Sequence, residues 1–160
     1  MNKLKALGFL FVFLVPVTLP TAAWLSLKTG MPNLMAWYPL FFLFVLVPAC
    51  DYALGHDSVN IEKSQESTIS NTFWFKALTL MVLPVQIASL IWSARWFVHQ
   101  DLNWLGTIGW LFSQGIVSSI LAINVAHELI HKDAKLERAI GGILLTSVSY
   151  YGFKIEHLRG

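Results

Sequence analysis

The chain has 160 residues, of which 56% are hydrophobic and only 12% are charged. Soluble domains carry about 25% charged residues, so this sequence has too few charges to cover a water-facing surface and is expected to be an integral membrane protein. The net charge of +2, without a basic cluster that contains aromatic residues, argues against a nucleic-acid partner. The single cysteine, Cys50, excludes an intrachain disulfide and a cysteine-rich metal site, so any metal must be held by histidine and carboxylate.

Four apolar segments approach the roughly 20 residues that a helix needs to cross a bilayer. In chain order they are Ala6–Leu27, Leu34–Leu54, Trp74–Trp96 and Trp104–Ala126. Prolines inside a membrane helix are tolerated because neighbouring helices satisfy the freed carbonyl groups, and they predict kinks. Five prolines lie inside the first three segments: Pro16, Pro20, Pro39, Pro48 and Pro84.

The first segment has an alternative interpretation as a cleaved signal peptide, since Lys3, Lys5 and the triplet Thr21-Ala22-Ala23 fit that outline. Its apolar run is longer than the usual 7–15 or so residues, and further spans follow, so a retained span is favoured. By the positive-inside rule the two lysines predict a cytoplasmic N-terminus. Alternation then places Asp51–Asn71 in the cytoplasm, Arg95–Asn103 outside, and the chain from His127 onward in the cytoplasm. Three basic residues after the fourth segment agree: Lys132, Lys135 and Arg138.

The next apolar segment, Ala139–Phe153, has about 15 residues and is too short to cross. An interfacial or re-entrant helix here would return Glu156 and His157 to the face that carries His127. The expected fold class is therefore all-α: a polytopic membrane helical bundle of about four transmembrane helices, plus this short helix.

The polar sequence Asn124-Val-Ala-His-Glu-Leu-Ile-His-Lys132 stands where the fourth apolar segment stops. His127 and His131 are four apart and share one helical face, with about 5–6 Å between their Cβ atoms, so they can hold one metal ion. Ionisable groups at the inner end of a span are costly and favour a functional role. His157 belongs to a second polar cluster and could join them, whereas His56 and His99 are interpreted as interfacial side chains.

Two chemistries share this spacing. His-Glu-x-x-His is the zinc metalloprotease signature, in which His127 and His131 bind zinc and Glu128 acts as general base. Glu156 could then serve as a third ligand. A non-enzymatic four-span scaffold or transporter piece is a further alternative. The motif alone does not decide between these functions.

The flanking residues resemble the integral-membrane alkane 1-monooxygenases. That family has a first histidine box His-Glu-x-x-His-Lys and a second box Glu-His-x-x-Gly-His-His. The similar stretches here are Asn124–Lys132, Lys135-Leu-Glu-Arg138, Tyr151-Gly-Phe153, Glu156-His-Leu-Arg-Gly160 and the earlier loop Asp51-Tyr-Ala-Leu-Gly-His-Asp57.

The resemblance implies that His127, His131 and His157 are iron ligands in a site with two non-haem irons. It also implies a six-span fold, of which residues 1–160 would be the N-terminal part of a single membrane hydroxylase domain, truncated inside the second box and inactive alone. The implied reaction is terminal hydroxylation of medium- or long-chain n-alkanes to primary alcohols with dioxygen and electrons from rubredoxin. The implied location is the bacterial inner membrane, with the boxes on the cytoplasmic side. Related fatty-acyl or aromatic-methyl hydroxylases and desaturases remain alternatives, as does the zinc protease.

Metal-bound histidines usually donate their second ring N–H to a carboxylate or carbonyl, so Glu128 and Glu156, and less strongly Asn124, are expected to orient the ligands. Three basic residues, Lys132, Lys135 and Arg138, could attract an acidic electron carrier, although setting topology is the favoured role. Four residues of the fourth segment could line a substrate tunnel, although packing against lipid or other helices is the simpler interpretation for each: Trp110, Phe112, Ile116 and Ile120.

Overall fold

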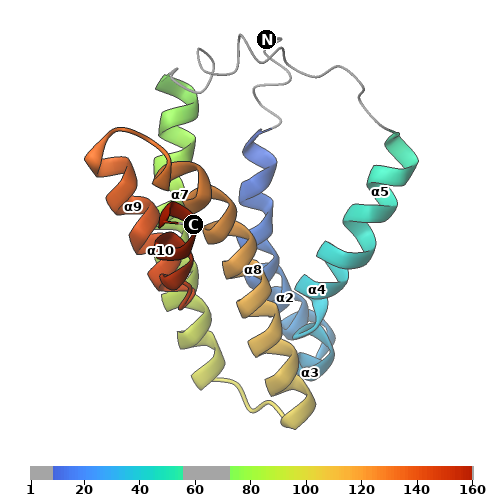
Figure 1. Ribbon diagram of the computed structural model, residues 1–160. Coiled ribbons are helices and arrows are strands. Elements are labelled where there is room, and N and C mark those ends of the chain that lie inside the picture. The colour runs from blue at the N-terminus through green and yellow to red at the C-terminus, as the bar shows by residue number, and fades with distance from the viewer. Residues whose placement is uncertain (1–8, 56–72, 160) are drawn as a thin grey trace.

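The computed structural model describes residues 9–55 and 73–159, and the regular secondary structure within these ranges is entirely helical (Figure 1). His56 and most of the predicted loop to Asn71 lie outside the described residues. The elements are η1 (Phe9–Phe13), α2 (Leu14–Thr29), α3 (Pro32–Met35), α4 (Tyr38–Phe41), the π-helical η2 (Phe42–Leu46), α5 (Val47–Leu54), α7 (Phe73–Val98), α8 (Trp104–Ile130), α9 (Lys135–Ser147) and α10 (Gly152–Arg159).

Three helical stretches are long and apolar enough to cross a membrane: Leu10–Thr29 with 20 residues, Phe73–Val98 with 26 and Trp104–Ile130 with 27. They confirm the first, third and fourth predicted spans. Pro20 and Pro84 lie inside α2 and α7 without ending either helix. The expected all-α membrane bundle is therefore the observed class of fold.

The second predicted span is shorter than the other three. The segment from Leu34 is broken near Trp37, and the continuous apolar helix is Tyr38–Leu54, which at about 1.5 Å per residue is roughly 26 Å long. Pro48 has no N–H to donate to the carbonyl four residues earlier. Just before it the helix widens to a π-turn, in which the N–H of Val47 donates to the carbonyl of Phe42. A wide turn thus stands where Pro48 predicted a kink.

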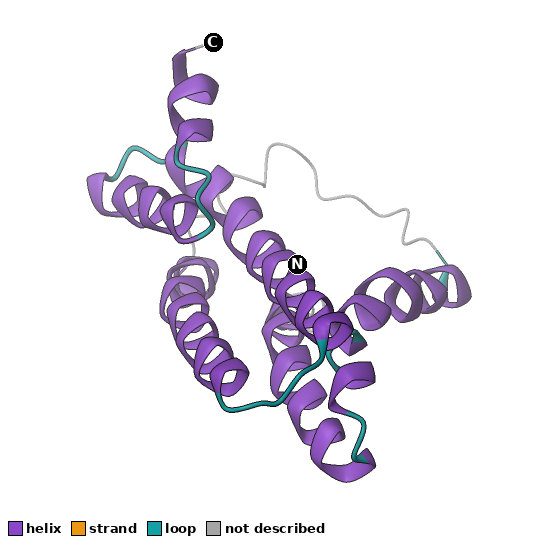
Figure 2. Cartoon of the chain, turned by 90° about the horizontal axis from the view of Figure 1, so that it is seen from below, coloured by secondary structure: helices purple, strands orange, loops and turns teal. Residues whose placement is uncertain are grey.

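The long helices alternate in direction. The beginnings of α2 and α7 and the ends of α5 and α8 lie at one end of the bundle, called here the histidine end, and α3 lies at the other (Figure 1). At the far end, the Asn33 Oδ1 accepts a hydrogen bond of 2.8 Å from the N–H of Asn103, which links α3 to the beginning of α8. The α5 helix leans away from the other helices in both views, and its residues are exposed (Figures 1 and 2).

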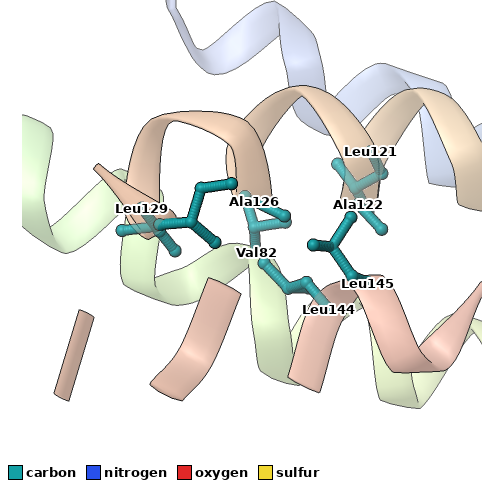
Figure 3. Close-up of a cluster of buried hydrophobic side chains, with 8 residues drawn as sticks. Val82, Leu121, Ala122, Ala126, Leu129, Leu144 and Leu145 are labelled. Carbon is teal, nitrogen blue, oxygen red and sulfur yellow. The ribbon is translucent and has the colours of Figure 1, made fainter. Parts of the chain in front are cut away.

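The core at the histidine end joins α7, α8 and α9 (Figure 3). The α9 helix packs closely along α8 because small residues meet at the contact. A Cβ atom added to Gly141 would lie 3.0 Å from the Leu129 Cβ and 3.1 Å from the Ala126 carbonyl oxygen. The buried members of this core are Val82, Leu121, Ala122, Ala126, Leu129, Ile130, Leu144 and Leu145.

The α9 and α10 helices form a hairpin. The turn between them includes Ser149 in a left-handed conformation with φ of 59° and a hydrogen bond of 2.8 Å from the N–H of Tyr150 to the carbonyl of Leu145. Lys154 on α10 donates 3.2 Å to the carbonyl of Arg138 near the beginning of α9, so the two helices run back along each other. The short segment returns as expected, and it brings α10 to the histidine end.

We expect Gly141→Val to lower the free energy of unfolding by about 1–3 kcal/mol, the usual cost of overpacking a filled contact. Gly115→Val is the matched control, since Gly115 also lies inside a helix but has nothing within 4 Å of its added Cβ. Both changes alter helix propensity by the same amount, so the difference between their effects reports the α8–α9 contact. The measurement is denaturant unfolding in detergent; equal losses for the two variants would contradict this packing.

Candidate metal centre

Three imidazole rings meet at the histidine end. His127 lies on the last turn of α8, His131 caps that helix, and His157 lies on α10. The Nε2 atom of His157 is 3.0 Å from the Nε2 of His127 and 2.9 Å from the Nε2 of His131. One ligand atom from each ring lies within 4.8 Å of the others. The structure thus brings together the three histidines that the sequence singled out as metal ligands.

The local fold explains why these rings converge. His127 and His131 are four positions apart, so both project from one face of α8, with ring centroids 5.2 Å apart. The α9–α10 hairpin then returns His157 across that face, with ring centroids 4.7 Å from His127 and 5.0 Å from His131. His127 is half-buried, and the other two rings are exposed, so the cluster is open on one side.

Hydrogen bonds among the rings do not account for this arrangement. Each imidazole nitrogen carries either one hydrogen or one lone pair. The Nε2 of His157 therefore can serve only one of its two neighbours. A cation placed among the three rings would be held by the lone pairs of His127, His131 and His157, whose ligand atoms lie within 4.8 Å of one another.

Aromatic rings support the cluster from one side. Phe153 stacks on His157, with 4.9 Å between ring centroids and 13° between ring planes. The same ring meets His127 at 6.0 Å and 62°. Phe153 thus contacts two of the three imidazoles.

The chain is similar in sequence to known proteins, although no protein-family model matches it. Over its whole length it aligns with alkane 1-monooxygenase 2 of Alcanivorax borkumensis at 40% identity. It aligns equally completely with alkane 1-monooxygenases 2 and 1 of Pseudomonas aeruginosa, at 36% and 38% identity. The chain is a homologue of the alkane 1-monooxygenases. It spans 42–43% of the length of these curated relatives.

The predicted resemblance to the alkane 1-monooxygenases is thereby confirmed beyond the histidine motifs that suggested it. The alignments cover 100% of this chain, so they include the α2–α5 region, in which no motif was recognised before Asp51. The similarity in sequence thus extends over the segment ahead of the first histidine box.

The structure does not bring the three candidate orienting residues into contact with the imidazoles. Glu128 and Glu156 are exposed, and neither carboxylate has a hydrogen-bond partner within the part of the chain that the structure describes. Adjacent residues on a helix point about 100° apart, which turns each glutamate away from its neighbouring histidine. Asn124 donates 3.0 Å to the Ile120 carbonyl on its own helix. Their orienting roles stay predictions.

The four tunnel candidates do not share one face of α8. Trp110 is 1% exposed and packs on Trp96, with ring centroids 4.0 Å apart, so it fills the core. Phe112 and Ile116 line a surface depression of about 270 Å³, and Ile120 is half-buried. A larger apolar cavity of about 680 Å³ lies between α2 and α7. That cavity was not predicted from the sequence. The available signal was the pair of prolines on α2, Pro16 and Pro20, which help to line the cavity.

Gln86, on the apolar helix α7, was also not predicted from the sequence, and its side chain is fully buried. Its Nε2 donates 3.3 Å to the Ser147 hydroxyl at the end of α9. The available signal was a glutamine in the middle of a 26-residue apolar helix, because polar side chains inside membrane helices often form hydrogen bonds to neighbouring helices.

Proposed function

We propose that this chain is the N-terminal part of a membrane monooxygenase that hydroxylates the terminal methyl group of n-alkanes. The observation that carries the proposal is the alignment of the whole chain with proteins named alkane 1-monooxygenase. In the proposed reaction one oxygen atom of dioxygen enters a C–H bond and the other leaves as water. Two electrons and two protons are consumed, so a reductant is required.

His127, His131 and His157 would hold iron in this proposal. Imidazole suits iron, and the three rings bring their nitrogen atoms together at one place. Iron, when bound, supplies the activation of dioxygen that the insertion into a C–H bond requires. Among the described residues, the ligand atoms of the cluster all belong to imidazole rings. Imidazole binds a metal ion in its neutral form.

The position of the cluster suits an apolar substrate and a polar reductant. The histidines lie where α8, a helix long and apolar enough to span a bilayer, ends in a charged segment. An alkane partitions into the hydrocarbon phase and would approach from that side. We propose that the histidine end faces the cytoplasm of a bacterial inner membrane, where rubredoxin would deliver electrons. Exposed Lys135 and Arg138 could attract this carrier, although setting topology is the favoured role of both.

Replacing any one of the three histidines by alanine should weaken iron binding by at least about 10–100-fold. A loss of this size already follows the removal of a residue that only hydrogen-bonds to a metal ligand. His99→Ala is the control: its Nδ1 lies 2.7 Å from the Arg95 carbonyl oxygen, just after α7 at the far end of the bundle. The measurement is anaerobic titration of the purified chain in detergent with ferrous iron. Equal affinity in His127→Ala and His99→Ala would refute the assigned ligands.

The reaction itself can be tested in membranes of cells that make the longer protein of which this chain is proposed to be the N-terminal part, supplied with n-octane, reduced rubredoxin and isotopically heavy dioxygen. We expect 1-octanol that carries the heavy oxygen, and we expect His157→Ala to abolish it while His99→Ala does not. Alcohol whose oxygen comes from water, or no difference between the two variants, would exclude the proposed monooxygenase.

The zinc protease alternative is separated by Glu128→Gln. A protease whose general base is Glu128 would lose its activity and keep its metal. For a monooxygenase, we expect alcohol formation to fall less than about tenfold, because the exposed Glu128 carboxylate contacts none of the three imidazoles. Alcohol formation and bound iron are measured in the same membrane preparation. Loss of all alcohol with iron retained would give Glu128 a direct role in the chemistry.

A further inference from the structure

Three rings at the beginning of α10 form a stacked column. Tyr150 stacks on Phe153 with 5.3 Å between centroids and 18° between planes, and Phe153 stacks on His157 at 4.9 Å and 13°. Phe153 and His157 are four positions apart, so the helix itself places one ring over the other. Phe153 also packs against the buried cluster that joins α7, α8 and α9. The column therefore connects the His157 imidazole to the core.

The His157 ring has little else to fix its orientation. It is exposed, and α10 has only 8 residues, which is short for a helix that must hold its own conformation. Metal-bound histidines are usually oriented by a hydrogen bond to the second ring nitrogen. Among the described residues, both nitrogen contacts of His157 are made by its Nε2, and its Nδ1 has no hydrogen-bond partner. The stacking contact with Phe153, and not a hydrogen bond to Nδ1, therefore constrains the orientation of the His157 ring.

We propose that Phe153 is a positioning residue of the metal centre, which holds the His157 imidazole with its Nε2 directed at His127 and His131. The inference rests on the proposed metal-binding function. Phe153 also contacts His127, with 6.0 Å between the ring centroids and 62° between the ring planes, and this contact fixes the side of α8 on which the Phe153 ring lies. Phe153 thus sets two imidazoles relative to each other without binding the metal itself.

The test compares Phe153→Leu, which keeps an apolar side chain against the core, with Phe153→Tyr, which keeps the ring. Tyr151→Leu is the matched control, because this ring lies on the same turn and contacts Lys154 but, among the described residues, no histidine. Phe153→Leu should weaken the binding of cobalt(II), titrated anaerobically in detergent, by roughly 3–10-fold, as expected for one lost ring stack. Phe153→Tyr and Tyr151→Leu should both bind cobalt(II) with the affinity of the unchanged chain.

A double-mutant cycle separates positioning from general damage. In the His157→Ala background, Phe153→Leu should have a smaller effect on cobalt affinity, because the ring on which Phe153 stacks is gone and only the contact with His127 remains. An effect of Phe153→Leu that is equally large in both backgrounds, or that Tyr151→Leu reproduces, would overturn the proposal. The ligand-field spectrum of bound cobalt reports in parallel whether the number of nitrogen ligands falls.

A measurement without metal separates the orientation of His157 from the proposed function. Only five histidines are present, so their ring protons can be followed by NMR in a histidine-labelled chain. The stacked phenyl ring should shift the His157 ring protons upfield. Phe153→Leu should abolish this shift and Phe153→Tyr should keep it; an unchanged His157 signal in Phe153→Leu overturns the positioning role. Failure of the longer protein to bind metal would overturn the proposed function, while this shift still decides the orientation of His157.

Discussion

The close contact between α8 and α9 is the constraint on which the candidate centre depends. Two of its histidines belong to α8, and the third is reached only through α9 and the turn that follows it. Gly141 allows α9 to approach to within 3.0–3.1 Å of Leu129 and Ala126, measured from the position of an added Cβ. Side chains of ordinary size at this contact would move the hairpin outward. A displacement of about 1 Å at this contact would disturb nitrogen contacts of 2.9 and 3.0 Å.

Periodicity and composition predicted much of the fold because a bilayer leaves few solutions. Every backbone polar group in hydrocarbon must be paired within the chain, so long apolar segments become helices whatever their local propensities. The weakest prediction was the second span, Leu34–Leu54, which begins later than expected at Tyr38. Hydropathy does not report a break at Trp37 or the π-turn before Pro48, because both arise from hydrogen-bond geometry rather than from apolarity.

The candidate site was predictable to a different degree at each position. The spacing of His127 and His131 on one helix face placed that pair from the sequence alone. The position of His157 required the hairpin, whose return depends on Ser149 adopting φ of 59° and on the Lys154 contact with Arg138. Nothing in the motif predicted Phe153 as a neighbour of two imidazoles, because that contact depends on how α10 is rotated against α8.

Gln86 illustrates how a polar group can specify position rather than stability. Its Nε2 reaches the Ser147 hydroxyl at 3.3 Å, while its Oε1 is buried without a partner among the described residues. Hydrogen bonds between membrane helices contribute only about 0.6 kcal/mol on average, and an unpaired buried carbonyl costs at least as much. Leucine would fill this space at no such cost, but an apolar contact between α7 and α9 tolerates sliding. The hydrogen bond fixes Ser147 opposite one residue of α7, and thereby the depth at which the chain turns back toward the histidines.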